Sequence, residues 1–158
     1  MSFFTAKAST DTVTQEAFHE DVEIPDAFKD SVSSLAFSPT ANILAVGGWD
    51  QQVRLYEIGQ GITGKAAYAH DGPVLDVCWN ADGAKVFSSG GDNTARMMDM
   101  QSGVASQVAT HQDTVMSVRW TGQHGGLLVT GSWDRTLKVC RRNSLRLVIR
   151  SVLCRHRD

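Results

Sequence analysis

Two histidines with carboxylates close by in the sequence are the residues of this chain whose types could support acid and base chemistry. His70 is followed by Asp71 and Asp76, and His111 is followed by Asp113. An imidazole beside a carboxylate can donate or accept a proton near neutral pH. The two groupings occur at the same place in two copies of one longer repeat, and a catalytic site is not normally duplicated with the period of a fold. We therefore predict no catalytic residue and no enzymatic activity.

The cysteines and glycines do not suggest metal, disulfide or phosphate chemistry. The cysteines are odd in number and lack a C-x-x-C spacing, which argues against a disulfide framework and a structural zinc site; they are Cys78, Cys140 and Cys154. The paired glycines at 47–48, 90–91 and 125–126 do not lead into Gly-Lys-Ser or Gly-Lys-Thr, so we interpret them as turn residues. We expect no cofactor, no metal and a reducing cellular compartment.

The elements that carry these residues form a threefold internal repeat. Three segments of similar pattern follow one another, at residues 31–57, 73–99 and 113–141. Their equivalent aspartates lie 42 residues apart, at Asp50, Asp92 and Asp134. A repeat of about 40 to 45 residues that is built from short strands is typical of one blade of a β-propeller.

Each copy of the repeat predicts four short strands. The apolar residues alternate with a period of two in short runs, which is the spacing of strands and too short for helices. In the second copy we expect strands at residues 74–79, 85–89, 94–99 and 104–110. The sequence therefore predicts an all-β fold, a partial β-propeller of three four-stranded blades. We expect the blades at residues 31–70, 71–111 and 112–140.

The chain resembles the WD-repeat propellers. In that family a His before the inner strand is typically paired with an Asp in the second turn, often with a Ser or Thr nearby, and the third strand ends in Trp-Asp. The resemblance implies a buried structural hydrogen-bond network, because a buried His and carboxylate must satisfy each other. Its members here are His70, Asp92, His111, Asp134, Ser89 and Ser132. The terminal Trp-Asp is degenerate in all three copies, at residues 56–57, 98–99 and 140–141.

A closer resemblance covers roughly residues 22–139 and is to the propellers that export messenger RNA at the nuclear pore. It is carried by the segments Ala69–Trp79, Lys85–Phe87 and Thr130–Lys138. Those propellers have seven blades and bind a short GLEBS-type segment of a nucleoporin. The resemblance implies a non-catalytic scaffold in the nucleus and at nuclear pores, also in the cytoplasm, that reaches RNA through its partner complex. The related spindle-checkpoint propellers give an alternative, a mitotic adaptor.

Two tryptophans and two arginines are the candidate partner-binding residues. Trp49 and Trp133 occupy corresponding turns, where the second copy has Gly91, so the turn itself does not require an aromatic residue. Exposed aromatic side chains are enriched at interaction hot spots. Arg54 and Arg96 follow the same turns and could meet acidic groups of a partner. The alternatives are that each Trp packs on the neighbouring blade and that both arginines are solvated strand ends.

The two ends of the chain have opposite charge. Residues 1–30 carry seven acidic residues against two lysines, and we expect this extension to be largely disordered. Residues 141–158 hold six of the ten arginines and depart from the family pattern. Arginines can neutralise RNA phosphates, so a basic-tailed RNA-binding fragment is a further alternative, although no aromatic residue is interleaved to stack on bases. We favour an outer strand of the third blade within residues 145–153.

Three copies are too few for a closed propeller, which needs at least four blades. We therefore interpret the chain as a truncated product whose open ends make it prone to association. With 158 residues, 42% of them hydrophobic, and a net charge of −2, it can bury one single-domain core. No apolar run approaches the ~18 residues of a membrane-spanning helix, so we predict no membrane insertion.

Overall fold

The computed structural model describes residues 23–24, 28–122, 126–141 and 146–150, and this part of the chain contains strands and turns but no helix. Its twelve strands form three antiparallel sheets of four. Blade one consists of β1 (Val32–Phe37), β2 (Ile43–Gly48), β3 (Gln52–Ile58) and β4 (Ile62–Ala69). Blade two consists of β5 (Val74–Trp79), β6 (Lys85–Gly90), β7 (Thr94–Asp99) and β8 (Ala105–Thr110). Blade three consists of β9 (Val115–Thr121), β10 (Leu127–Ser132), β11 (Thr136–Arg141) and β12 (Arg146–Arg150).

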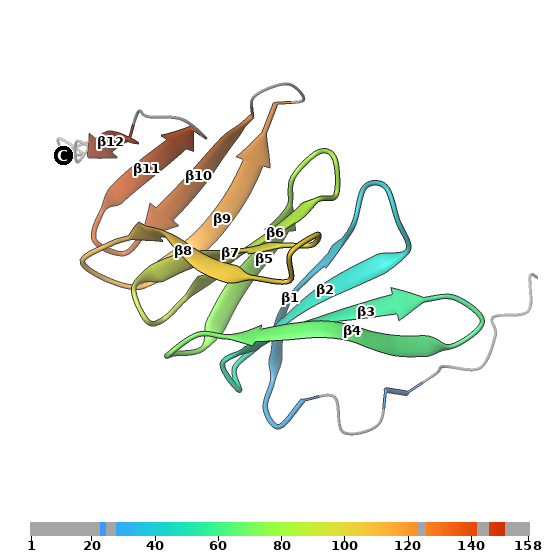
Figure 1. Cartoon of the computed structure of the whole chain (residues 1–158). Coiled ribbons are helices and arrows are strands. Elements are labelled where there is room, and N and C mark those ends of the chain that lie inside the picture. The colour runs from blue at the N-terminus through green and yellow to red at the C-terminus, as the bar shows by residue number, and fades with distance from the viewer. Residues whose placement is uncertain (1–22, 25–27, 123–125, 142–145, 151–158) are drawn as a thin grey trace, which may run out of the picture.

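The three sheets stand side by side with their first strands nearest one another (Figure 1). Strand β5 lies between β1 and β9, so blade two contacts both other blades. Within each sheet the strands follow chain order from the inner to the outer edge. The all-β fold and the partial propeller predicted from the repeat are confirmed. Within the described residues, nothing resembles a membrane-crossing helix.

The sheet of blade three continues past residue 140, where we expected the repeat pattern to end. Strand β11 runs to Arg141, and β12 pairs with it in an antiparallel register from Thr136↔Arg150 to Cys140↔Arg146. The expected outer strand within residues 145–153 is therefore present. Leu147, Val148 and Ile149 favour an extended backbone, which explains why a strand forms although the family pattern has been lost.

An extra residue interrupts the inner strand of every blade at the same place. The register shifts fall between residues 32 and 34, 74 and 76, and 115 and 117. In a regular strand, side chains three positions apart point to opposite faces, and a bulge of one residue reverses that relation. Accordingly Val74 and Val77 both lie against Gly47 of blade one, where an added Cβ would meet their methyl groups at 2.7 and 3.2 Å. The bulge thus turns both valines toward the preceding blade.

The hydrophobic core is divided between the two junctions of neighbouring blades. At the first junction, buried residues of blade one such as Val53 and Leu55 form a cluster with Val74 and Val77 of blade two. At the second junction, Phe87 of blade two stacks on Trp120 of blade three, with ring centroids 5.3 Å apart. Complete burial of one Val or Leu side chain contributes about 1.5–3 kcal/mol. Contacts between blades are therefore a main source of stability.

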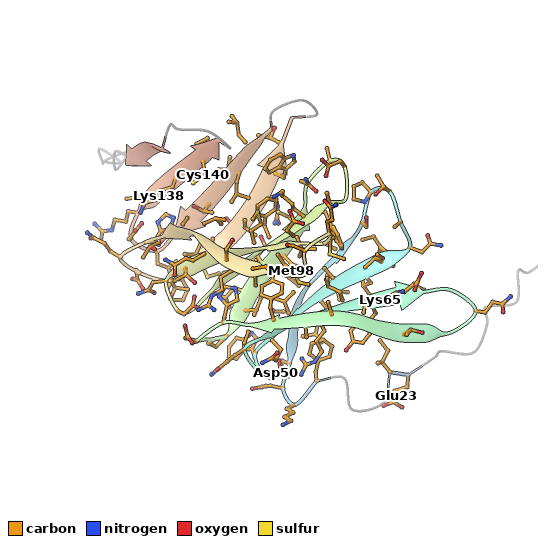
Figure 2. All side chains as sticks on the ribbon, in the orientation of Figure 1. Glu23, Asp50, Lys65, Met98, Lys138 and Cys140 are labelled. Carbon is orange, nitrogen blue, oxygen red and sulfur yellow. The ribbon has the colours of Figure 1, made fainter. Side chains whose placement is uncertain are left out.

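One turn recurs in all three blades and sets the positions of the candidate site residues. It joins the second and third strands, and its last residue has a positive φ of 70° at Gln51, 64° at Asn93 and 66° at Arg135. A left-handed residue after a tight turn is a common way to close a three-residue hairpin. The residue just before it is the repeated aspartate, so the turn places each aspartate at the same rim of its blade. Figure 2 labels Asp50 at this rim.

Candidate functional site

A chain of four hydrogen-bonded side chains links β4 of blade one to blade two. Tyr68 Oη donates to Ser88 Oγ at 2.8 Å, and Ser88 Oγ lies 2.7 Å from His70 Nε2. His70 Nδ1 lies 3.0 Å from Asp92 Oδ2. Asp92 also accepts hydrogen bonds from the backbone and hydroxyl of Thr94. The predicted pairing of His70 with Asp92 is therefore present in the structure.

The environment of His70 favours a neutral imidazole. Burial lowers its pKa, and this effect exceeds the opposite effect of the Asp92 carboxylate. Burial alone would raise the pKa of Asp92, but hydrogen bonds from Asp71 N, His70 and Thr94 outweigh it and lower that pKa. With Asp92 charged, Nδ1 of His70 carries the proton and donates to it. Nε2 is then free to accept a hydrogen bond from Ser88.

Blade three repeats the arrangement with threonines. His111 Nδ1 lies 3.1 Å from Asp134 Oδ2 and 3.0 Å from Thr136 Oγ1, and its Nε2 lies 2.9 Å from Thr130 Oγ1. Burial lowers the pKa of His111. Burial alone would raise the pKa of Asp134. Hydrogen bonds, among them those from Thr136, outweigh this effect and hold the pKa of this carboxyl far below its usual range. The pairing of His111 with Asp134 is thus also present.

Blade one keeps the aspartate but replaces the histidine. Phe28 stands at the corresponding position, and the guanidinium carbon of Arg54 lies 4.5 Å from the centre of its ring, a cation–π contact. Arg54 forms an ion pair with Asp50 at 2.7 Å and thereby lowers the pKa of that carboxyl. Asp50 still accepts backbone hydrogen bonds from Lys29 and Gln52, as its counterparts do. Residues 28–30, expected to belong to the N-terminal extension, are therefore part of the structured blade.

The expected hydroxyl partners were assigned one or two residues too late. Ser88, not Ser89, contacts His70, and Ser89 Oγ is buried without a hydrogen-bond partner. In blade three Thr130 contacts His111, whereas Ser132 Oγ donates to the backbone oxygen of Asp113. For Ser89 the reason is the alternation of strand side chains, which points adjacent residues to opposite faces. The 42-residue spacing of Ser88 and Thr130 was a usable signal.

Ser88, His70 and Asp92 are hydrogen-bonded in the same order as the residues of a catalytic triad. Unlike the nucleophile of a triad, however, Ser88 cannot be reached by a substrate. Ser88 has no exposed surface, and the Tyr68 hydroxyl already donates to its oxygen. A nucleophile must reach the reacting atom of its substrate. The same geometry therefore serves as a structural brace between the second strand, the third strand and the loop that carries the histidine. The flanking carboxylates also fail to form an acid–base pair with His70, because Asp71 Oδ2 contacts Arg96 and Asp76 is engaged elsewhere.

Asp76 connects all three blades, which the sequence reasoning missed. Its carboxylate accepts hydrogen bonds from Ser34 Oγ of blade one and from Val118 N of blade three, each at 3.0 Å. It also forms an ion pair with Arg119 of blade three. The Asp76 residue is only 7% exposed. A buried carboxylate needs such partners, so Asp76 acts as a polar link across both junctions.

The two candidate tryptophans are exposed on the rim formed by the aspartate turns. Trp49 is 52% exposed and Trp133 is 62% exposed, so neither is buried against a neighbouring blade. The backbone N–H of each donates across its own blade, to Ser31 O and Thr114 O, and Gly91 N makes the equivalent bond to Pro73 O in blade two. The turns are therefore held alike, with or without an aromatic side chain. Their role in partner binding stays a prediction.

The two candidate arginines are engaged inside the blades. Both nitrogens at the end of Arg54 contact Asp50. Arg96 donates to Ala69 O at 2.9 Å, and its Nη2 lies 2.5 Å from Asp71 Oδ2. Figure 2 labels the corresponding residue of blade three, Lys138, whose ammonium group donates to Thr110 O. These contacts differ from the solvated strand ends considered above, and they leave binding to a partner as a prediction.

The remaining expectations concern a metal site and the two terminal segments. Within the described ranges no cluster of three or more His, Cys, Asp or Glu could hold a metal ion. Residues 1–22, 25–27, 142–145 and 151–158 lie outside the described part, and with them most of the acidic extension and of the basic tail. The expectations of disorder and of RNA binding for these segments therefore stay predictions.

Comparison with known proteins identifies the repeat. The sequence model described as "WD domain, G-beta repeat" matches residues 23–57, 65–99 and 104–140. Among curated proteins, the Poly(A)+ RNA export protein of Schizosaccharomyces pombe is 48% identical over 145 residues. That alignment covers 87% of this chain and 41% of the relative.

Two further relatives give the same pattern. The mRNA export factor GLE2 of Chaetomium thermophilum is 41% identical, over 85% of this chain and 40% of its own length. Protein Rae1 of Drosophila melanogaster is 43% identical, over 75% of this chain and 36% of its own length. The chain thus spans less than half the length of these relatives. Three matched repeats, three four-stranded sheets and their repeated aspartate turns place the chain in the WD domain, G-beta repeat family.

Proposed function

We propose that this chain is a non-catalytic scaffold that binds a nucleoporin segment and serves nuclear export of messenger RNA at the nuclear pore. The observation that carries the proposal is the 48% identity, over most of the chain, to a protein named for poly(A)+ RNA export. The absence of a solvent-accessible nucleophile in the Ser88–His70–Asp92 arrangement supports a binding role rather than a catalytic one. The nucleus and the nuclear pore follow as the place of action.

The rim with the aspartate turns is the surface we propose for the partner segment. Trp49 and Trp133 project from this rim at corresponding positions of blades one and three, with Gly91 between them in the repeat. Their turns are fixed by hydrogen bonds to Ser31 O and Thr114 O, so the side chains are presented from a rigid base. A partner loses less entropy when it binds a preorganised surface. Two aromatic anchors on a rigid rim suit an extended peptide.

Isothermal titration of the full chain with a GLEBS-type nucleoporin peptide tests the proposal. We expect Trp49→Ala and Trp133→Ala each to weaken binding by about tenfold or more, since anchoring aromatic residues commonly cost over 1 kcal/mol when truncated. The matched control is Val104→Ala. Val104 is 61% exposed but lies between β7 and β8, at the opposite rim.

The possible results test two statements separately: that the two tryptophans anchor the peptide, and that the chain binds the peptide at all. Unchanged affinity in the Trp49→Ala, Trp133→Ala double variant would remove the rim as the binding surface. A folded chain that shows no binding to the peptide at all would overturn the scaffold proposal. A deletion of residues 141–158 that leaves peptide affinity intact would favour the scaffold over the RNA-binding alternative.

A further inference from the structure

The first strand of blade one exposes apolar side chains that the other two blades bury. Val32, Leu35 and Phe37 are 47%, 63% and 63% exposed. The corresponding residues of blade two are buried; they are Val74, Val77 and Trp79 at 0%, 3% and 8% exposure. In blade three Val115 and Val118 are fully buried as well. We call Val32, Leu35 and Phe37 the leading face, since it is the face that each blade turns toward the blade before it.

At each junction the leading face of one blade packs on the blade before it, and the surface of that preceding blade has three recognisable parts. A small residue of the second strand admits the first valine, as Gly47 admits Val74. A polar side chain of the inner strand accepts a backbone N–H from the next blade: Ser34 Oγ accepts from Val77 N at 3.2 Å, and Asp76 Oδ2 accepts from Val118 N at 3.0 Å. An apolar residue of the third strand, Val53 at the first junction, packs beside them.

Blade three presents the same three parts on its outer surface. By the 42-residue repeat, Gly131 corresponds to Gly47 and Leu137 corresponds to Val53. Ser117 corresponds to Ser34 and Asp76, because each stands two residues after the first valine of its inner strand. All three line one groove of about 580 Å³ together with Met116 and Trp133. Met116 and Leu137 are 41% and 37% exposed. We call this groove the trailing groove.

We propose that the leading face of one molecule packs into the trailing groove of a second copy of this chain. Val32 would lie over Gly131, as Val74 lies over Gly47 at the first junction. The backbone N–H of Leu35 would donate to Ser117 Oγ, as the equivalent N–H groups donate at both internal junctions. The chain carries both halves of a junction that it already forms twice, and this points to another copy as the occupant. The two surfaces differ, so the contact is head to tail and the association is heterologous.

Sedimentation velocity of the full chain over a range of concentrations tests the contact. We expect the wild type to associate increasingly with concentration. Leu35→Asp removes the leading face, and Leu137→Asp removes the trailing groove, so each variant alone is monomeric. An equimolar mixture of the two variants keeps one intact face and one intact groove. It therefore forms a 1:1 dimer that cannot grow further.

Matched variants keep the test interpretable. Val104→Asp puts the same charge on an exposed apolar residue outside both surfaces and leaves association unchanged. Met116→Asp is a second groove variant, because Leu137 retains some packing in its own blade. Circular dichroism verifies that every variant is folded. Trp133 also lines the trailing groove. Trp49 belongs to neither surface, so the effect of Trp49→Ala on the peptide titration is the result that is separate from self-association.

Three outcomes overturn the proposal. A wild type that is monomeric at every concentration shows that a second copy does not occupy these two surfaces. Association that persists in both groove variants but disappears in Leu35→Asp indicates a symmetric contact between two leading faces. A mixture of Leu35→Asp and Leu137→Asp that stays monomeric excludes the head-to-tail contact directly.

Discussion

Ser88 Oγ lies 2.7 Å from Nε2 of His70, and the two residues change together between blades. Blade three has Thr130 with His111 at the equivalent positions, whereas blade one has Val46 with Phe28. The interior therefore holds either a polar pair or an apolar pair. This follows from the cost of a buried polar group that loses its partner, which exceeds the net gain from the bond itself.

A double-mutant cycle at this pair is the first prediction. Ser88→Val leaves His70 Nε2 and the Tyr68 hydroxyl without their partner, and we expect it to lower the free energy of unfolding by about 1–3 kcal/mol. Replacing His70 and Ser88 together by the blade-one residues, Phe and Val, should cost less than the sum of the two single changes. Urea unfolding of dilute protein measures all four corners. Strict additivity would contradict the coupling.

The second prediction concerns pH. His70 and His111 have pKa values lowered by burial, whereas in the unfolded chain both should titrate near 6.5. The unfolded chain therefore binds more protons as the pH falls through this value, and the folded state loses stability below about pH 6.5. Each histidine contributes a slope of up to about 1.4 kcal/mol per pH unit. Above pH 6.5 this contribution is constant.

Urea midpoints measured between pH 7.5 and pH 5 verify that dependence. In the His70→Phe, Ser88→Val variant the slope should be smaller, because one of the two buried imidazoles is gone. The two aspartates affect stability at lower pH than the histidines. The pKa values of Asp92 and Asp134 are lowered in the fold, so their contribution to the free energy of unfolding is lost only as the pH falls below about 4. An unchanged slope between pH 6.5 and pH 5 in the variant would exclude His70 as a source.

The third prediction is that Asp76 holds the blades together. Asp76→Ala leaves the buried N–H of Val118 and the hydroxyl of Ser34 without an acceptor, and we expect a loss of about 2–4 kcal/mol in the free energy of unfolding. The matched control is Arg119→Met. The Arg119 side chain is largely exposed, so losing its ion pair should cost less than about 1 kcal/mol. Equal losses in both variants would show that the ion pair, not the backbone contact, dominates.

The fourth prediction concerns the thiol of Cys78. Burial, reinforced by the Asp76 charge, raises its pKa to about 12. Because only the thiolate reacts, alkylation of native Cys78 at pH 8 should be on the order of a hundredfold or more slower than in urea-unfolded protein. Peptide mass spectrometry after a timed pulse of iodoacetamide measures both rates. Equal rates in the two states would mean that the thiol is not protected by the junction with blade three.

The parts of the structure that could be predicted from sequence are those that obey the repeat. Strand pattern and spacing located the blades, because turn chemistry and a 42-residue period are local signals. The pairs of His70 with Asp92 and of His111 with Asp134 were implied by the resemblance to the WD-repeat propellers. The outer strand β12 could be expected only in outline. Its segment has lost the family pattern but keeps consecutive residues of high β propensity.

Features that depend on the direction in which a side chain points could not be predicted from the repeat pattern. Ser89 is one residue from the correct hydroxyl, and along a strand one residue is the difference between the two faces. Asp76 looked like a possible partner for His70 because it is near in sequence, yet its partners come from both neighbouring blades. Arg54 was placed correctly on a strand, but its contact with Phe28 required knowledge of where residues before the first strand lie.

The repeated bulge in the inner strands has a consequence for how such a protein can arise by duplication. The single extra residue at Ser33, Leu75 or Met116 sets which neighbour the apolar residues on both sides of it face. A copied blade that lost this residue would keep its composition and its turns but would direct Val74 or its equivalent away from the preceding sheet. Lengthening a turn between two strands has no such effect. Natural variation in blade length should therefore collect in the turns and avoid one position of the inner strand.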